Sequence, residues 1–265
     1  MFLPAGGFSG NEGLNIARYL RDKFETHLID LPGLGKSQGI EGRITPLKLA
    51  EWVKEYMDQS QIDKAFLIGH SLGGAILLAF AIYYPDRVYK LILLDEGHKP
   101  FPRIPKSEFG SFAYAFPLLS VCVQLFGKYF LNRLAPFFMQ DNEQGKDDFA
   151  VNVKEFCDRV AIEENEYIRI AMKNPGEFSE NGLKLMFGYY NLNLPSMLKK
   201  IKVPTHLIYA TFETIHETEY KRTGKYIQKF KDSNLPIEYS SVNSGHYVHW
   251  SSVFPWKDLK KSLSD

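Results

Sequence analysis

One serine lies in a sequence context that can make its hydroxyl a nucleophile. The segment Gly69–Gly74 (GHSLGG) fits the pattern G-x-S-x-G, with the apolar run AFLIG before it and an apolar helical segment after it. Between a buried strand and a helix, this pattern forms a sharp turn that exposes the serine at the carboxyl end of the strand. The N–H of Leu72 would lie at a helix N-terminus and could donate to a developing oxyanion. We predict that Ser71 is the nucleophile of an acyl transfer.

A second motif adds a resemblance to a known family. Residues 30–37 (DLPGLGKS) resemble the D-x-P-G-x-G-x-S loop of the α/β-hydrolase family, upstream of the serine at the usual kind of distance. The resemblance covers nearly the whole chain. It implies a mostly parallel α/β-hydrolase sheet flanked by helices, with an inserted helical cap. It also implies that the family's first hairpin is missing, because only Met1–Pro4 precedes the first oxyanion loop.

That loop is assigned to residues 5–8 (AGGF), which resemble the H-G-x segment of the family. The resemblance implies that the backbone N–H of Gly7 is the second oxyanion donor, beside that of Leu72. We expect Phe8, His70 and His249 to bind substrate, with His249 lining the pocket or packing against Trp250.

A serine hydroxyl needs a base, and the resemblance assigns this role to His246. The segment SGHYVHW follows the last predicted strand and resembles the family's G-H motif, and the order Ser, acid, His fits the family. The acid is assigned to Glu213, which falls at the acid position of the Y-G-x-x-D pattern in residues 209–213 (YATFE). Some relatives supply the acid from the preceding strand, so Glu96 and Asp95 remain alternatives.

Strand-like and helix-like segments alternate at both ends of the chain, which is typical of a parallel sheet with right-handed crossovers. Strands are predicted at residues 26–30, 65–69, 91–95, 205–210 and 237–241, and helices at 45–57, 72–84, 148–161, 219–230 and 255–263. The predicted core is residues 1–96 and 201–265. Residues 97–200 form the predicted cap, with nine aromatic residues between Phe109 and Phe138.

Composition excludes several classes of function. The 265 residues carry a net charge of +1 and no basic run, which argues against a nucleic-acid partner. Two cysteines cannot form a disulfide framework, and no His/Cys/Glu spacing indicates a metal. We expect no cofactor. The N-terminus lacks the features of a signal peptide, so a cytoplasmic location is expected. The uncharged run 112–126 leaves peripheral membrane contact as a minor alternative.

These patterns together predict a serine hydrolase. The expected substrate is the carboxylic ester or thioester of an apolar small molecule, cleaved through an acyl-enzyme. The alternatives within the fold are hydrolysis of a C–C bond or of a peptide. The alternative from another class is a non-catalytic ligand receptor that retains the hydrolase fold. The presence of both Ser71 and His246 favours the enzyme.

Overall fold

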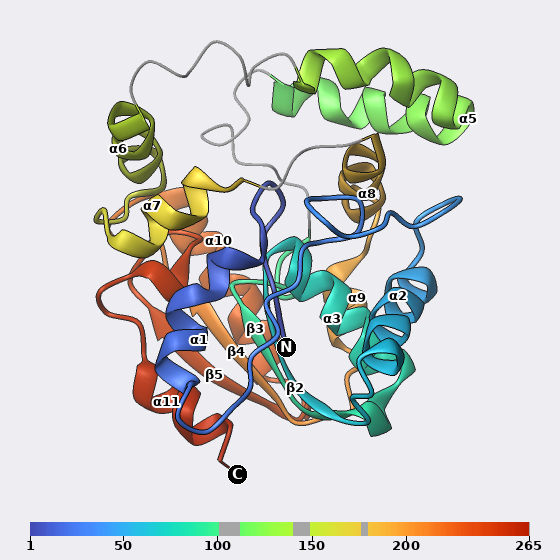
Figure 1. The fold of residues 1–265 in the computed structure, drawn as a ribbon. Helices are drawn as coiled ribbons and strands as arrows, with labels where there is room; N and C mark the ends of the chain where they lie inside the picture. The colour runs from blue at the N-terminus through green and yellow to red at the C-terminus, as the bar shows by residue number, and fades with distance from the viewer. Residues whose placement is uncertain (101–111, 140–148, 176–179, 265) are drawn as a thin grey trace.

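The molecule is built around a parallel sheet whose strands lie side by side in chain order (Figure 1). The computed structural model describes residues 1–100, 112–139, 149–175 and 180–264. The five strands are β1 (Phe2–Leu3), β2 (Ala65–His70), β3 (Val88–Leu94), β4 (Thr205–Ala210) and β5 (Ile237–Val242). Every neighbouring pair is parallel, which confirms the predicted fold class.

Helices cover both faces of the sheet. One face carries α1 (Leu14–Leu20) and α11 (Trp256–Ser262), and the other carries α2 (Pro46–Gln59), α3 (Leu72–Tyr83), α9 (Leu194–Leu198) and α10 (Glu217–Lys231). Side chains of β3 alternate between the two cores: Leu91 and Leu93 pack with α3, and Ile92 and Leu94 pack with α1. This period of two is the ordinary consequence of a strand buried on both faces.

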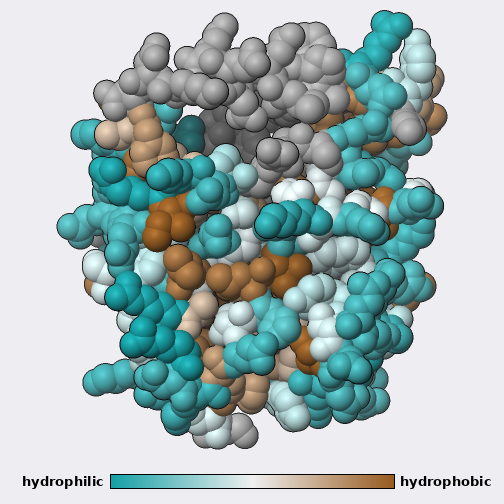
Figure 2. All heavy atoms as spheres, viewed as in Figure 1, coloured by the Kyte–Doolittle hydropathy of each residue, from teal (hydrophilic) through white to brown (hydrophobic). Residues whose placement is uncertain are grey.

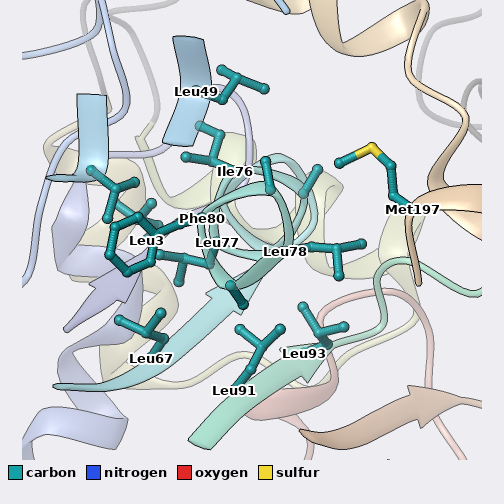
Figure 3. Packing of buried hydrophobic residues seen from close by; sticks show 14 of the residues in the cluster. Leu3, Leu49, Leu67, Ile76, Leu77, Leu78, Phe80, Leu91, Leu93 and Met197 are labelled. Carbon is teal, nitrogen blue, oxygen red and sulfur yellow. The ribbon is translucent and has the colours of Figure 1, made fainter. Parts of the chain in front are cut away.

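Helix α3 is the central helix of the core. It is buried from Leu72 to Ala81, as expected for a helix that is apolar on every side. Figure 3 shows its side chains between those of β2 and β3 on one side and Leu49 of α2 on the other. The packing fixes the N-terminus of α3, where Ser71 lies.

The predicted elements are found with small shifts at their ends, with one exception. The segment predicted as a strand at residues 26–30 forms only an isolated bridge, in which Leu28 pairs with Phe2. The described residues also include the short 3₁₀ helices η1 (Gly10–Gly13), η2 (Pro85–Arg87) and η4 (Val248–Trp250). Helix η1 carries Glu12, and η4 carries His249.

Among the described residues between β3 and β4, the regular elements longer than a single bridge are all helices. This segment contains α5 (Phe112–Met139), α6 (Phe149–Val160), α7 (Glu166–Lys173) and α8 (Glu180–Tyr190). Gly127, with φ 52° and ψ −130°, divides α5 into two helices. Figure 1 shows α5 at the end of the molecule farthest from the chain's C-terminus. Phe109 lies outside the described residues.

The surface is mixed in character. Figure 2 shows a face on which hydrophilic side chains predominate around a smaller hydrophobic group near its middle. Among the described residues, every helix is too short or too polar to cross a bilayer.

Candidate active site

Ser71 occupies the turn between β2 and α3 that its sequence context predicts. Its backbone has φ 50° and ψ −123°, a conformation that non-glycine residues rarely adopt and that costs on the order of 1–3 kcal/mol. The turn closes tightly, because a Cβ on Gly69 would lie 2.6 Å from the Cα of Gly74. Only glycine permits this approach at position 69, and a Cβ on Gly73, the second glycine of the G-x-S-x-G pattern, would collide with the backbone of Leu3.

The predicted oxyanion loop lies against the same helix end. Gly7 has φ 93°, in a turn closed by the N–H of Phe8 donating to the carbonyl of Ala5 at 3.3 Å. A Cβ on the adjacent Gly6 would lie 3.4 Å from Cδ2 of Leu72. The first N–H groups of a helix have no partner within the helix. The loop and the start of α3 thus lie side by side, and the role of the Gly7 and Leu72 N–H groups as oxyanion donors stays a prediction.

His246 is bonded to an aspartate that follows β3. Its Nδ1 lies 2.7 Å from Oδ2 of Asp95. Its ring lies 4.7 Å, between centroids, from the ring of His70, the residue before Ser71. With Nδ1 donating to the carboxylate, Nε2 is the nitrogen that can accept a proton, since a neutral imidazole has one donor and one acceptor. The arrangement suits a general base whose ring lies beside His70, the residue that precedes Ser71.

The Asp95 carboxylate is fixed by two neighbouring elements. It is 3% exposed, and its Oδ1 accepts the N–H of Ala210 at the end of β4 at 3.0 Å. Burial alone would raise the pKa of Asp95, but the Lys99 ammonium, 3.8 Å away, and His246 together place that pKa well below its ordinary value. Asp95 is therefore ionised and can hold the His246 ring in one orientation and one tautomer.

The expected acid, Glu213, does not take this position. Its side chain is exposed, in the loop after β4, and its backbone N–H donates to Oγ1 of Thr211 at 3.4 Å. The His246 nitrogen that an acid would orient is already bonded to Asp95. The structure thus brings Asp95, one of the two alternatives, to His246 in place of Glu213. The signal that could have found Asp95 is a carboxylate directly after the buried run LILL.

The three residues expected to bind substrate are all buried. Phe8 is 8% exposed and packs edge-on against Phe156 and Trp250. His249 is 1% exposed, and its ring centroid lies 5.0 Å from that of Trp250. His70 is completely buried. The structure places all three rings in packed surroundings, and their role in binding substrate stays a prediction.

Glu12 is a functional candidate that sequence reasoning missed. It is completely buried, and its Oε1 lies 2.5 Å from Nδ1 of His70. The Nε2 of His70 lies 3.1 Å from the carbonyl of His246 and must donate, because a carbonyl only accepts. The other Glu12 oxygen, Oε2, accepts the N–H of Ala5. Glu12 thereby connects the oxyanion loop, the elbow and the His246 loop.

The same cluster is where a metal could be held among the described residues. Glu12, His70 and His249 are buried, and one ligand atom from each lies within 4.8 Å of the others. The interactions present are hydrogen bonds, however, with Glu12 bonded to both His70 and the Ala5 N–H. We therefore interpret the cluster as a support for the loops around Ser71.

Replacing Glu12 with alanine is expected to lower the free energy of unfolding by about 3–5 kcal/mol. The change leaves the His70 ring and the Ala5 N–H buried without their carboxylate, and the loss of one partner of a buried pair costs about this much. Chemical denaturation measures the effect. Glu51→Ala, at an exposed position of α2, is the matched control and should change stability by less than about 0.5 kcal/mol. Equal stabilities of the two variants would contradict the supporting role.

The sequence similarity to a known family lies in the N-terminal part of the chain. The model of the α/β-hydrolase fold family matches residues 1–116. A 2-hydroxy-6-oxo-6-phenylhexa-2,4-dienoate hydrolase of Burkholderia cepacia is 43% identical over 96 residues, which are 35% of this chain. The match spans about a third, 32%, of that relative's length.

Other similarities extend over the whole chain at lower identity. A pimeloyl-[acyl-carrier protein] methyl ester esterase of Wigglesworthia glossinidia brevipalpis is 25% identical over 261 residues, covering 91% of this chain and 85% of that protein. The crystal structure of an E-2-(acetamidomethylene)succinate hydrolase superimposes with a TM-score of 0.68 at 16% identity, covering 100% of this chain and 90% of that one. Together with the parallel sheet, these similarities show that the chain adopts the α/β-hydrolase fold.

Proposed function

We propose that this protein is a serine hydrolase whose triad is Ser71, His246 and Asp95. The observation that carries the proposal is the bond from His246 Nδ1 to the buried Asp95, with the His246 ring beside the strained turn of Ser71. Recognition of such triads rests on geometry and roles rather than on sequence position. The placement of the acid after β3 is therefore compatible with the activity.

The proposed reaction proceeds through an acyl-enzyme. Ser71 Oγ attacks the substrate carbonyl carbon while its proton passes to Nε2 of His246. The N–H groups of Gly7 and Leu72 stabilise the oxyanion. The intermediate collapses, and the leaving alcohol or thiol takes the proton from His246. Water, deprotonated by His246, then attacks the acyl carbon and releases the acid and Ser71.

We propose an ester or thioester with an apolar acyl group as the substrate. The helical segment after β3 supports an apolar group, since α5 has no acidic residue and only two basic ones among its 28. Some of its rings form the segment's own core: Phe116 is completely buried and stacks on Phe187 at 4.6 Å. The similarity to a methyl ester esterase over most of the chain supports an ester.

Activity on p-nitrophenyl esters is expected to rise from acetate towards medium chain lengths. Each buried methylene contributes up to about 0.8 kcal/mol, so kcat/KM should increase by at most about 4-fold per carbon. Initial rates across acetate, butyrate, hexanoate and octanoate, and across the matching thioesters, measure the trend. A steady fall from acetate to octanoate would remove the apolar acyl site. Absence of turnover on every substrate would count against the hydrolase itself.

A second candidate is hydrolysis of a dienoate of the kind named for the Burkholderia cepacia relative. The 43% identity over 96 residues favours it, although the match covers only 35% of this chain. Adding 2-hydroxy-6-oxo-6-phenylhexa-2,4-dienoate to the panel separates the candidates. A kcat/KM for this compound above that for every ester would favour the second.

A further inference from the structure

Lys99 is a largely buried cation at the reaction centre that takes no step in the proposed reaction. Its ammonium lies 3.8 Å from Oδ2 of Asp95, and its side chain is 16% exposed. The same Oδ2 lies 2.7 Å from Nδ1 of His246. One carboxylate oxygen is therefore shared by His246 and by an ammonium from a residue four positions after the acid.

Three residues from the segment after β4 hold the ammonium of Lys99 in place. It donates to Oγ1 of Thr223 at 3.3 Å, lies 3.9 Å from Oε2 of Glu219, and lies 4.5 Å from the ring centroid of Phe212. An exposed lysine contributes little to an ion pair, because fixing its long side chain costs entropy and water screens its charge. Here the packing and these partners fix the ammonium, so its charge acts on Asp95 from a defined position.

The charges of this cluster alternate in sign. Protonated His246 meets Asp95, Asp95 meets Lys99, and Lys99 meets Glu219, whose Oε1 lies 3.0 Å from Nη1 of Arg222. A carboxylate beside an imidazole favours its protonated form, and a cation disfavours it. Lys99 therefore opposes part of the effect of Asp95 on His246, and Glu219 limits how large this opposition is.

We propose that Lys99 is a positioning residue of the triad, whose ammonium holds the Asp95 carboxylate and opposes the protonation of His246. The neutral imidazole can then accept the proton of Ser71 at pH values at which an imidazole beside an uncompensated aspartate would already be protonated. Asp95 still supplies the counter-charge for the imidazolium that forms in the reaction. The inference rests on the proposed roles of these three triad residues.

Other titratable groups lie around His246 and could contribute to its pH dependence. They are His70 of β2, Glu96 and His98 after β3, the adjacent Tyr247, and Glu12 and His249 around His70. Burial, followed by Lys99, lowers the pKa of His98 to about 3, so this ring is neutral at the pH values compared. Burial raises the pKa of Glu96 to about 7, so one arm of the experiment removes this carboxyl.

Lys99→Met tests the inference, because methionine is also unbranched but carries no charge. The measurement is kcat/KM on one p-nitrophenyl ester from about pH 5 to about pH 9, and the readout is the acid-side pH at which each profile reaches half of its own plateau. We expect this half-maximum to lie about 0.5–1 pH unit higher in Lys99→Met than in the wild type, less than a direct charged partner produces. Lys99→Arg keeps the charge and should lie nearer to the wild type than to Lys99→Met.

Glu219→Gln gives a prediction of opposite sign, and it tests the inference even if Lys99→Met does not fold. Loss of that carboxylate leaves the ammonium less compensated, so the half-maximum should move below that of the wild type. Lys221→Met, at a position of α10 whose side chain is 71% exposed, is the matched control and should leave the half-maximum unchanged.

Three results would overturn the inference. They are an unchanged half-maximum in Lys99→Met, a half-maximum of Glu219→Gln at or above that of the wild type, and a shift in Lys99→Met that disappears when both compared proteins carry Glu96→Gln. The last result would assign the effect to the titration of Glu96.

Covalent labelling with a fluorophosphonate keeps this result distinct from the proposed function. Labelling that is lost in Ser71→Ala, together with unshifted pH profiles, removes the role of Lys99 alone. Labelling that survives Ser71→Ala removes the proposed function as well. Thermal unfolding verifies that each variant is folded.

Discussion

Replacing Ser71 with alanine is expected to lower kcat for ester hydrolysis by about 10⁶-fold and to abolish labelling by a fluorophosphonate. The change removes the attacking oxygen, while His246, Asp95 and the backbone donors stay in place. Loss of the serine in such a triad removes nearly all the catalysis that its members supply together. Steady-state rates and the mass of the labelled protein measure the two effects.

Ser60→Ala is a suitable control, since Ser60 ends α2 away from the elbow. It should retain wild-type labelling and rates within about 2-fold, as expected for a substitution outside the site. Equal labelling of wild type and Ser71→Ala would show that another residue reacts. The assignment of the nucleophile would then fail, together with the proposed mechanism.

The turn that carries Ser71 could be predicted from the sequence because the physics of such a turn is local. Strand, glycine, serine and glycine follow one another within a few residues, and Ser71 adopts the strained backbone that this order implies. The same holds for most elements of the sheet, whose apolar runs are long enough to be recognised. Residues 26–30 formed only a bridge because their partner there, β1, is two residues long.

The carboxylate that contacts His246 could not be predicted, because this contact depends on where two neighbouring strands end. Asp95 continues the pairing of β3 with β4, with its N–H donating to Ile208 at 2.8 Å. Its Oδ1 then meets the N–H of Ala210. A sequence pattern shows that carboxylates follow both strands, but not which of them the loop of His246 reaches across a gap of 151 positions.

The contacts of Glu12 and of the buried rings also join residues that are far apart in the sequence. Glu12 is 58 positions from His70, and no local pattern predicts their contact. His70 is completely buried, and it contacts the carbonyl of His246, which lies 176 positions farther along the chain.

Replacing Asp95 with asparagine is expected to lower kcat by about 10⁴-fold. The Ala210 N–H should hold the amide oxygen in the place of Oδ1, which turns the amide nitrogen towards His246 Nδ1. A donor there favours the tautomer with its proton on Nε2. That nitrogen could then no longer accept the proton of Ser71, and the imidazolium formed in the reaction would lose its counter-charge.

Glu213→Gln is the matched comparison, since it also exchanges a carboxylate for an amide of the same size. Glu213 is exposed and Asp95 holds His246, so kcat should stay within about 2-fold of the wild type. Rates for both variants at saturating ester, with circular dichroism to verify the fold, complete the test. A large loss of kcat in Glu213→Gln, together with a kcat near that of the wild type in Asp95→Asn, would reverse the assignment of the acid. Such a result would mean that the loop after β4 rearranges to bring Glu213 to His246 when substrate binds.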